Sequence, residues 1–184
     1  MARLSVLYGP MCAGKTAALI RCADSAASSH ARRVVVRHAS DDRQLVPDRS
    51  TTAPLLLRSR TGSTLPVDAR VPALLSLPLS AHTLFVVDEA QFFPDLLRFW
   101  RALAPLPGAS LLAAGLDRDY RRQPFGETLA LAAAAGALGG GEGLVQPLLA
   151  RCCHRAAPSG AEGRLIHSGA WGAASLSMRK GTAC

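Results

Sequence analysis

Long apolar runs and secretion signals are missing from the sequence as given, so neither a membrane protein nor a secreted one is expected. No stretch of about 18 consecutive apolar residues occurs among the 184 residues, so no transmembrane helix and no membrane partner are expected. The N-terminus lacks a basic region followed by an apolar run and a cleavage site, so we expect a soluble, cytoplasmic protein. About half of the residues are apolar, which is enough for one globular domain with its own core.

Lysine and aromatic residues are also scarce. The net charge is +8, yet only Lys15 and Lys180 among the 21 basic residues are lysine. Strong basicity can indicate a nucleic-acid partner. Here the arginines are scattered and are not interleaved with aromatic residues, which argues against one. A triphosphate ligand explains part of the positive charge better, so no nucleic-acid partner is predicted.

Cysteine pairs with the C-x-x-C spacing of metal sites are absent as well. The odd number of cysteines and the expected intracellular setting argue against a disulfide framework. The five cysteines are Cys12, Cys22, Cys152, Cys153 and Cys184. We interpret Cys12 and Cys22 as packed or exposed thiols, not as ligands.

Short apolar runs alternate with helical patterns along the first two thirds of the chain. This alternation predicts an α/β fold with a mostly parallel sheet and crossover helices. The predicted strands are residues 3–8, 33–38, 83–87 and 110–116. The predicted helices are residues 16–27, 96–103 and 127–135, with a short one within 71–78 that its prolines limit. Residues 39–70 are predicted to be irregular or to contain a hairpin.

A glycine-rich segment, residues 136–143, marks a shift in composition. We therefore predict a main domain over residues 1–138 and a small, irregular C-terminal lobe over residues 139–184.

The first strand leads into a phosphate-binding loop. Its pattern is G-x-x-x-x-G-K-[ST], between a predicted strand and a predicted helix, the context in which this motif binds nucleoside triphosphates. Backbone N–H groups and the helix N-terminus would hold the phosphates, Lys15 would reach the β- and γ-phosphates, and Thr16 would ligate Mg²⁺. The loop consists of Gly9, Pro10, Met11, Cys12, Ala13, Gly14, Lys15 and Thr16. The alternative is a glycine-rich turn with a chance Lys-Thr pair.

A second motif is the acidic pair Asp88-Glu89, which ends the apolar run at residues 83–87. Ligands of open α/β sheets bind at the carboxyl ends of the strands. One carboxylate can hold the Mg²⁺ and its water shell, and the other can act as a general base on an acceptor hydroxyl. The two side chains would point to opposite faces if strand geometry continued. Alternatively, Asp88 only caps the next element.

Three ordered blocks together resemble the type II, or cellular, thymidine kinases. They are the phosphate loop at residues 9–16, the stretch D-E-A-Q-F-F-P-D at residues 88–95, and G-L-D-R-D-Y-R-R-Q-P-F-G at residues 115–126. The resemblance covers residues 3–135 well and the rest poorly. It implies a RecA-like P-loop fold and Mg²⁺-dependent transfer of the ATP γ-phosphate to the 5′-hydroxyl of thymidine or deoxyuridine, for dTMP salvage and DNA precursor synthesis.

The resemblance also implies roles for individual residues. Glu89 becomes the general base and Asp88 serves the Mg²⁺ site, while Gln91 joins the nucleotide-binding set. Residues 37–43 are similar to the family's second-strand block, which gives Asp41 an acidic position at the Mg²⁺ and Arg43 a catalytic, charge-offsetting position. A solvated loop with a local ion pair is the other interpretation of Asp41 and Arg43.

Further matches fall on the family's nucleoside pocket, where a pyrimidine needs flat apolar walls. Ordinary core packing is the alternative for each of them. Phe92 and Phe93 are adjacent, so we expect one to lie in the core and the other to line the pocket. The matching residues are Met11, Phe92, Leu116, Tyr120 and Phe125.

The C-terminal region departs from the family pattern. The family has a four-cysteine zinc site built from two C-x-x-C pairs and a loop that closes over the nucleoside. Here Cys152 and Cys153 are adjacent and the second pair is missing, although His154 and His167 could substitute. We do not expect an intact structural zinc, for which Cys152 and Cys153 are weak candidates.

Two function hypotheses follow. The first is an ATP-dependent thymidine kinase that forms a homo-oligomer, a tetramer by family resemblance. The second is a nucleotide-binding P-loop paralogue that lacks nucleoside kinase activity because of its altered C-terminal region. A nucleic-acid motor is disfavoured by the short chain and by the pocket residues.

Overall fold

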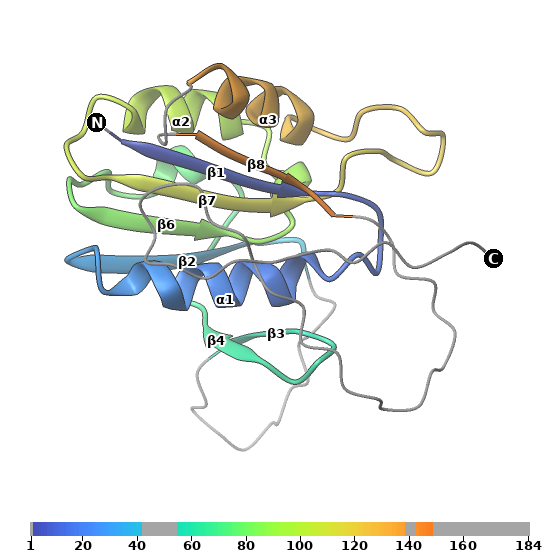
Figure 1. Cartoon of the computed structure of the whole chain (residues 1–184), viewed down its shortest axis with the longest axis horizontal. Helices are drawn as coiled ribbons and strands as arrows, with labels where there is room; N and C mark the ends of the chain where they lie inside the picture. The colour runs from blue at the N-terminus through green and yellow to red at the C-terminus, as the bar shows by residue number, and fades with distance from the viewer. Residues whose placement is uncertain (1, 42–54, 139–142, 149–184) are drawn as a thin grey trace, which may run out of the picture. The chain divides into compact units, whose positions relative to one another are not determined.

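A six-stranded parallel sheet forms the centre of the computed structural model, which describes residues 2–41, 55–138 and 143–148. The strand order is β5-β2-β6-β7-β1-β8, and each neighbouring pair is parallel (Figure 1). A separate antiparallel hairpin is formed by β3 and β4. The strands are β1 (Arg3–Tyr8), β2 (Arg32–His38), β3 (Leu56–Arg58), β4 (Thr64–Pro66), β5 (Ala69–Val71), β6 (Thr83–Val87), β7 (Ser110–Gly115) and β8 (Gly143–Pro147).

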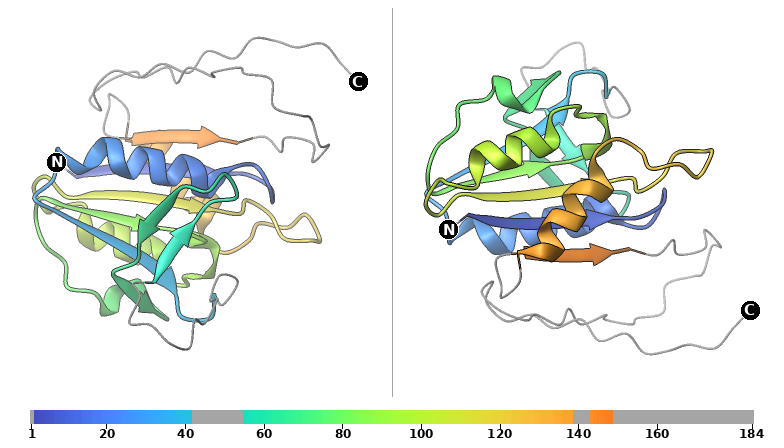
Figure 2. Two further views of the ribbon diagram at one scale, coloured as in Figure 1. Left: turned by 90° about the horizontal axis from the view of Figure 1, so that it is seen from below. Right: turned by 90° about the horizontal axis from the view of Figure 1, so that it is seen from above.

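Helices cover both faces of this sheet. One face carries α2 (Leu96–Leu103) and α3 (Thr128–Ala137), and the other carries α1 (Lys15–Ala27), with the β3–β4 hairpin against α1 (Figures 1 and 2). Two 3₁₀ turns, η1 (Leu74–Ser76) and η2 (Ala90–Phe92), complete the elements. Because both faces are covered, the central strands are mostly apolar, and all five residues of β6 are buried.

The main core lies between the sheet and the α2–α3 layer. Phe85 of β6 and Phe99 of α2 meet edge to face with their ring centroids 5.2 Å apart. Trp100 and Leu103 of α2 and Leu131 of α3 belong to the same buried cluster. Alternate residues of each strand face this cluster, so the intervening residues face α1.

The predicted fold class is confirmed, and the bounds of the four predicted strands and of the three longer predicted helices lie within two residues of those observed. Two strands and one helix differ. β5 and β8 are the edge strands of the sheet and were not predicted, and residues 71–78 contain only the 3₁₀ turn η1 where a short helix was predicted. Residues 39–70 were predicted to be irregular or to contain a hairpin, and they contain the β3–β4 hairpin.

The predicted C-terminal lobe and its boundary with the main domain lie largely outside the described residues, so that division stays a prediction. In the part of the chain that the structure describes, none of the helices is long and apolar enough to cross a membrane.

Candidate active site

Three loops with predicted site residues leave the sheet at the carboxyl ends of β1, β6 and β7. Tyr8 pairs with Gly115, and Val87 pairs with Ala113, so these strands end at nearly the same level. The phosphate loop follows β1, the acidic pair follows β6, and residues 116–126 follow β7. The fold therefore brings the three sequence blocks to the edge where α/β proteins bind ligands.

The phosphate loop turns into α1 at Gly14, whose φ of 80° and ψ of 18° are left-handed. This conformation favours glycine because it has no Cβ. The next residue, Lys15, is mostly buried, and its Nζ donates to the carbonyl oxygens of Gly9 (3.1 Å) and Pro10 (2.7 Å). The amine thus lies within the loop, where phosphate oxygens would offer it charged acceptors in place of neutral carbonyls.

Two opposing effects act on the Lys15 amine. Burial lowers its pKa, and the nearby carboxylates Glu89, Asp88 and Asp117 oppose that shift. The cation of the phosphate loop is therefore in the field of the acidic pair after β6.

Thr16 and Asp88 form the candidate metal site. The Thr16 hydroxyl lies 3.4 Å from Oδ1 and 3.3 Å from Oδ2 of Asp88, across 72 residues of sequence. Adjacent ligands of an octahedral Mg²⁺ are about 3 Å apart, as follows from Mg–O distances near 2.1 Å. The two side chains are therefore spaced to share one Mg²⁺ or its bound water.

The described residues contain no group of three or more His, Cys, Asp or Glu side chains that could hold a metal ion. Mg²⁺ needs no such group, since it is usually held by one or two carboxylates together with substrate phosphates and water.

Asp88 is buried, and its environment disfavours the charged form. Burial raises the pKa of its carboxyl to about 7, and the negative charge of Glu89 adds to the rise. A backbone N–H bond at Glu89 and the positive charge of Arg37 act in the opposite direction. A divalent cation beside Asp88 would favour the carboxylate strongly.

Arg37 and Asp41 form an ion pair beside this site. Nη2 of Arg37 donates to Oδ2 of Asp41 at 2.6 Å, and both side chains are almost completely buried. Nε and Nη1 of Arg37 have no hydrogen-bond partner among the described residues. The assignment of Asp41 to the Mg²⁺ stays a prediction. Arg37 is a charged residue of the site region to which the sequence motifs gave no role.

Glu89 does not continue the strand, so the expected opposite placement of Asp88 and Glu89 by strand alternation does not apply. β6 ends at Val87, and Glu89 has φ 52° and ψ 46°, in the left-handed region. The backbone turns here into η2, with Phe92 N–H donating to Glu89 O at 3.1 Å. The turn, and not strand alternation, separates the two carboxylates.

Gln91 lies between this acid and the next loop. Its side chain is buried, and its Nε2 donates to Oε2 of Glu89 at 2.6 Å. Its Oε1 accepts from the backbone N–H of Leu116 at 2.8 Å. The structure therefore connects Gln91 directly to the proposed base, whereas the family resemblance had placed it among the nucleotide-binding residues.

Aromatic rings line the region beside η2. Phe92 meets Phe125 edge to face with centroids 5.7 Å apart, which joins two of the predicted pocket residues. Phe93 is completely buried in the core, and its ring also packs on the ring of His38 with the centroids 4.9 Å apart. His38 lies 6.0 Å from Phe92 as well, a neighbour that the sequence pattern did not indicate.

The loop over residues 116–126 folds back on itself. Arg118 and Pro124 form an antiparallel bridge, and Oδ1 of Asp119 accepts from the N–H groups of Arg121 (2.8 Å) and Gln123 (2.9 Å). Tyr120 lies on this loop with 86% of its surface exposed.

Met11 is also exposed, at 63%, on the phosphate loop. Met11 and Tyr120 are thus solvent-facing, whereas Phe92 and Phe125 are packed together. Arg43, Cys152 and Cys153 lie outside the described residues, as do His154 and His167, so their predicted roles stay predictions.

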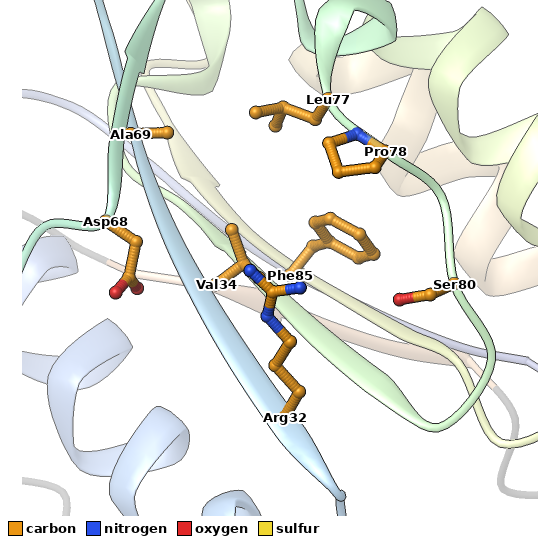
Figure 3. Close-up of a pocket in the computed structure, with 8 residues that line it drawn as sticks. All are labelled: Arg32, Val34, Asp68, Ala69, Leu77, Pro78, Ser80 and Phe85. Carbon is orange, nitrogen blue, oxygen red and sulfur yellow. The ribbon is translucent and has the colours of Figure 1, made fainter.

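A cavity of about 210 Å³ lies away from these loops. Arg32, Val34, Phe85 and Pro78 border it (Figure 3), together with Asp68, Ala69, Leu77 and Ser80. None of the sequence-predicted site residues lines it, so we do not assign it to the chemistry.

A phosphate loop between β1 and α1, with a carboxylate after β6 beside its threonine, defines a P-loop nucleotide-binding protein. Comparison with known families narrows this class. The model of the family described as thymidine kinase matches residues 2–162. The chain belongs to the thymidine kinase family.

Individual relatives agree with this assignment. The chain is 32% identical to a thymidine kinase of Fowlpox virus over 130 residues, which cover 70% of this chain and 68% of the relative. It is 32% identical to a thymidine kinase of Deinococcus deserti over 168 residues, 89% of this chain and 79% of the relative. Cytosolic thymidine kinase of Homo sapiens is 30% identical over 137 residues, 70% of this chain.

The matched segment spans only about half of the human protein, 51% of its length. The family match itself extends through residue 162 and therefore beyond the last described residue, Leu148.

Proposed function

We propose that this protein is an ATP-dependent thymidine kinase that transfers the γ-phosphate of ATP to the 5′-hydroxyl of thymidine. Deoxyuridine is the second acceptor to be tested, and dTMP salvage for DNA synthesis is the proposed role. The observation that supports the proposal is the proximity of Thr16 to Asp88, with Glu89 next in sequence, because it joins a phosphate loop, a candidate metal ligand and a candidate base at the carboxyl edge of the sheet.

The donor half of the site is the phosphate loop. Its backbone N–H groups and the start of α1 would hold the β- and γ-phosphates, and the Lys15 ammonium would offset their negative charge. Thr16 and Asp88 would hold Mg²⁺, which neutralises charge on the phosphates when it is bound. Arg43 and Asp41 complete the proposed set as the family resemblance implies.

The acceptor half lies between η2 and the 116–126 loop. Phe92, Phe125 and Leu116 would form apolar walls for the pyrimidine, and the exposed Met11 and Tyr120 would cover its open side. Glu89 would remove the proton of the 5′-hydroxyl while that oxygen attacks the γ-phosphorus in line with the leaving ADP oxygen.

Replacement of Glu89 tests the base directly. In Glu89→Gln the side chain keeps its size but cannot accept the proton, so we expect kcat for thymidine phosphorylation to fall at least about 100-fold, the range of general-base contributions. MgATP affinity, measured with a fluorescent ATP analogue, should stay within about threefold. Retained turnover in Glu89→Gln would exclude the proposed role of this residue.

The second candidate function is nucleotide binding without kinase activity, which the adjacent Cys152 and Cys153 motivate because they break the family's cysteine pattern. Transfer of label from γ-labelled ATP to thymidine, assayed with the full chain, separates the two. MgATP binding without labelled dTMP or dUMP would favour the second candidate.

The assembly and location of the protein are part of the same proposal. We propose a cytoplasmic homo-oligomer, a tetramer, without a nucleic-acid or membrane partner and without a structural zinc. Light scattering coupled to size-exclusion chromatography would give the oligomeric state, and metal analysis of the purified chain would give its zinc content.

A further inference from the structure

Glu89 has two features that make the position of its carboxylate a separate problem from its chemistry. It follows the buried strand β6 in a left-handed conformation, which costs about 1 kcal/mol for a residue with a side chain. Its side chain is also long and has several rotatable bonds, whereas proton abstraction needs the carboxylate within hydrogen-bond reach of one hydroxyl. Neighbouring groups must therefore hold the carboxylate.

The amide of Gln91 is one of these groups. Its Nε2 lies 2.6 Å from Oε2 of Glu89 and its Oε1 lies 2.8 Å from the backbone nitrogen of Leu116. The Leu116 N–H can only donate and an ionised carboxylate can only accept, so a single orientation of the amide satisfies both neighbours. Rotating the amide by 180° would lose both hydrogen bonds.

The surroundings of Gln91 restrict it further. Only 4% of its surface is exposed. A Cβ on Gly126 would lie 2.3 Å from the backbone oxygen of Gln91, and one on Gly115 would lie 3.0 Å from its Oε1. The last residue of β7 and the last residue of the 116–126 loop thus pack directly on Gln91, since neither glycine has a side chain to separate them.

We propose that Gln91 is a positioning residue that fixes the Glu89 carboxylate relative to the 116–126 loop. Its amide joins the base to the backbone of Leu116, which the proposed function places in the wall of the nucleoside pocket. One side chain then holds both the base and the backbone of the loop that would bind the nucleoside. The Glu89 carboxylate therefore stays aligned with the 5′-hydroxyl of the bound nucleoside. This inference rests on the proposed role of Glu89 as general base.

The test is Gln91→Leu, which keeps the approximate volume and loses both hydrogen bonds. A misplacement of about 1 Å can cost about 100-fold in rate, so we expect kcat to fall by about 10- to 100-fold. KM for ATP should change less than about threefold, because the phosphate loop is untouched. Hydrogen exchange at the Leu116 amide should become faster, a readout that does not depend on activity.

Thr128→Val is the matched control. Thr128 is completely buried, and its Oγ1, which has no hydrogen-bond partner among the described residues, lies 2.8 Å from where a Cβ on Gly115 would be. Valine has nearly the same shape as threonine, and the substitution lies close to Gln91 but leaves both of its hydrogen bonds intact. It should leave kcat and Leu116 exchange unchanged.

Different outcomes separate this inference from the proposed function. If Glu89→Gln loses turnover while Gln91→Leu keeps kcat within threefold, the positioning role is wrong and the base stands. If Gln91→Leu raises KM for ATP without lowering kcat, Gln91 acts in nucleotide binding and the inference is overturned. Should Gln91→Leu fail to fold, Gln91→Asn, whose amide is one methylene too short to join both partners, is subject to the same criteria.

Discussion

The buried carboxyl group of Asp88 should make the stability of the metal-free protein depend on pH. Its folded-state pKa of about 7 lies above its ordinary value of 3.8, so the folded protein binds more protons than the unfolded chain between these pH values. Stability therefore falls as the pH rises from about 4 to about 7. Asp88→Asn removes this titration. The free energy of unfolding of the variant minus that of the parent should therefore increase as the pH rises through this interval, by up to about 4 kcal/mol.

Urea denaturation of both proteins without Mg²⁺, at pH 5 and pH 8, measures the part of this difference that falls between those values, about 3 kcal/mol. Subtracting the two proteins cancels groups that titrate independently of Asp88. A gain of the same size at both pH values would contradict the proposed ionisation.

At the level of residues, sequence motifs were predictable and individual side-chain hydrogen bonds were not. The phosphate loop and Asp88-Glu89 are short patterns, each with a chemistry that depends on neighbours in sequence. The Arg37–Asp41 pair spans four residues and the Gln91–Glu89 bond spans two, yet both depend on side-chain orientation. The second bond of Gln91 also depends on a loop 25 residues further along. The left-handed turn at Glu89 was not predictable, because the apolar strand pattern that ends at Val87 gives no sign of a turn two residues later.

Between elements, Asp95 joins α2 to η1. It precedes α2, yet its carboxylate accepts from the N–H groups of Leu74 (3.1 Å) and Leu75 (2.8 Å) in place of capping its own helix. Asp95→Ala would leave both donors without this acceptor, so the free energy of unfolding should fall by about 3 kcal/mol, as expected for hydrogen bonds to a charged group.

Asp24→Ala is the control for this change, because Asp24 is 60% exposed and pairs with Arg33 on the surface. Removing an exposed ion pair should cost less than about 1 kcal/mol. Urea denaturation of the two variants and the parent gives both values. An equal effect of the two substitutions would show that Asp95 does not join the elements as described.

The elements themselves were predictable where burial imposes a pattern. β6 and α2 have the predicted bounds, because one is buried throughout and the other buries Leu96, Phe99, Trp100 and Leu103 at helical spacing. β8 was not predictable, since its residues are exposed or half-buried and it joins the sheet through backbone bonds to β1. Prolines at 72 and 78 restrict the segment between them to the short turn η1.

On the scale of the whole molecule, parallel strands explain why distant motifs lie at one edge of the sheet. β1, β6 and β7 run in the same direction, so the segments that follow them emerge at one edge although they are far apart in sequence. The alternation of strands and helices predicts this arrangement. The strand order does not follow from the pattern, because the apolar runs of the central strands are chemically alike.

A ligand bound at this edge should stabilise the entire domain, since the phosphate loop connects β1 of the central sheet to α1. MgATP at 100 times its Kd should add about 2.7 kcal/mol and raise Tm by roughly 5 to 10 °C. ATP with EDTA should give a smaller rise, because Thr16 and Asp88 then hold no cation against the phosphates. In Thr16→Val, which removes the hydroxyl beside Asp88, the additional rise with Mg²⁺ should be smaller than in the parent, while Asp88 and the phosphates remain as ligands. Thermal unfolding of the parent and of Thr16→Val under both conditions is the measurement, and an additional rise with Mg²⁺ that is undiminished in Thr16→Val would place the cation elsewhere.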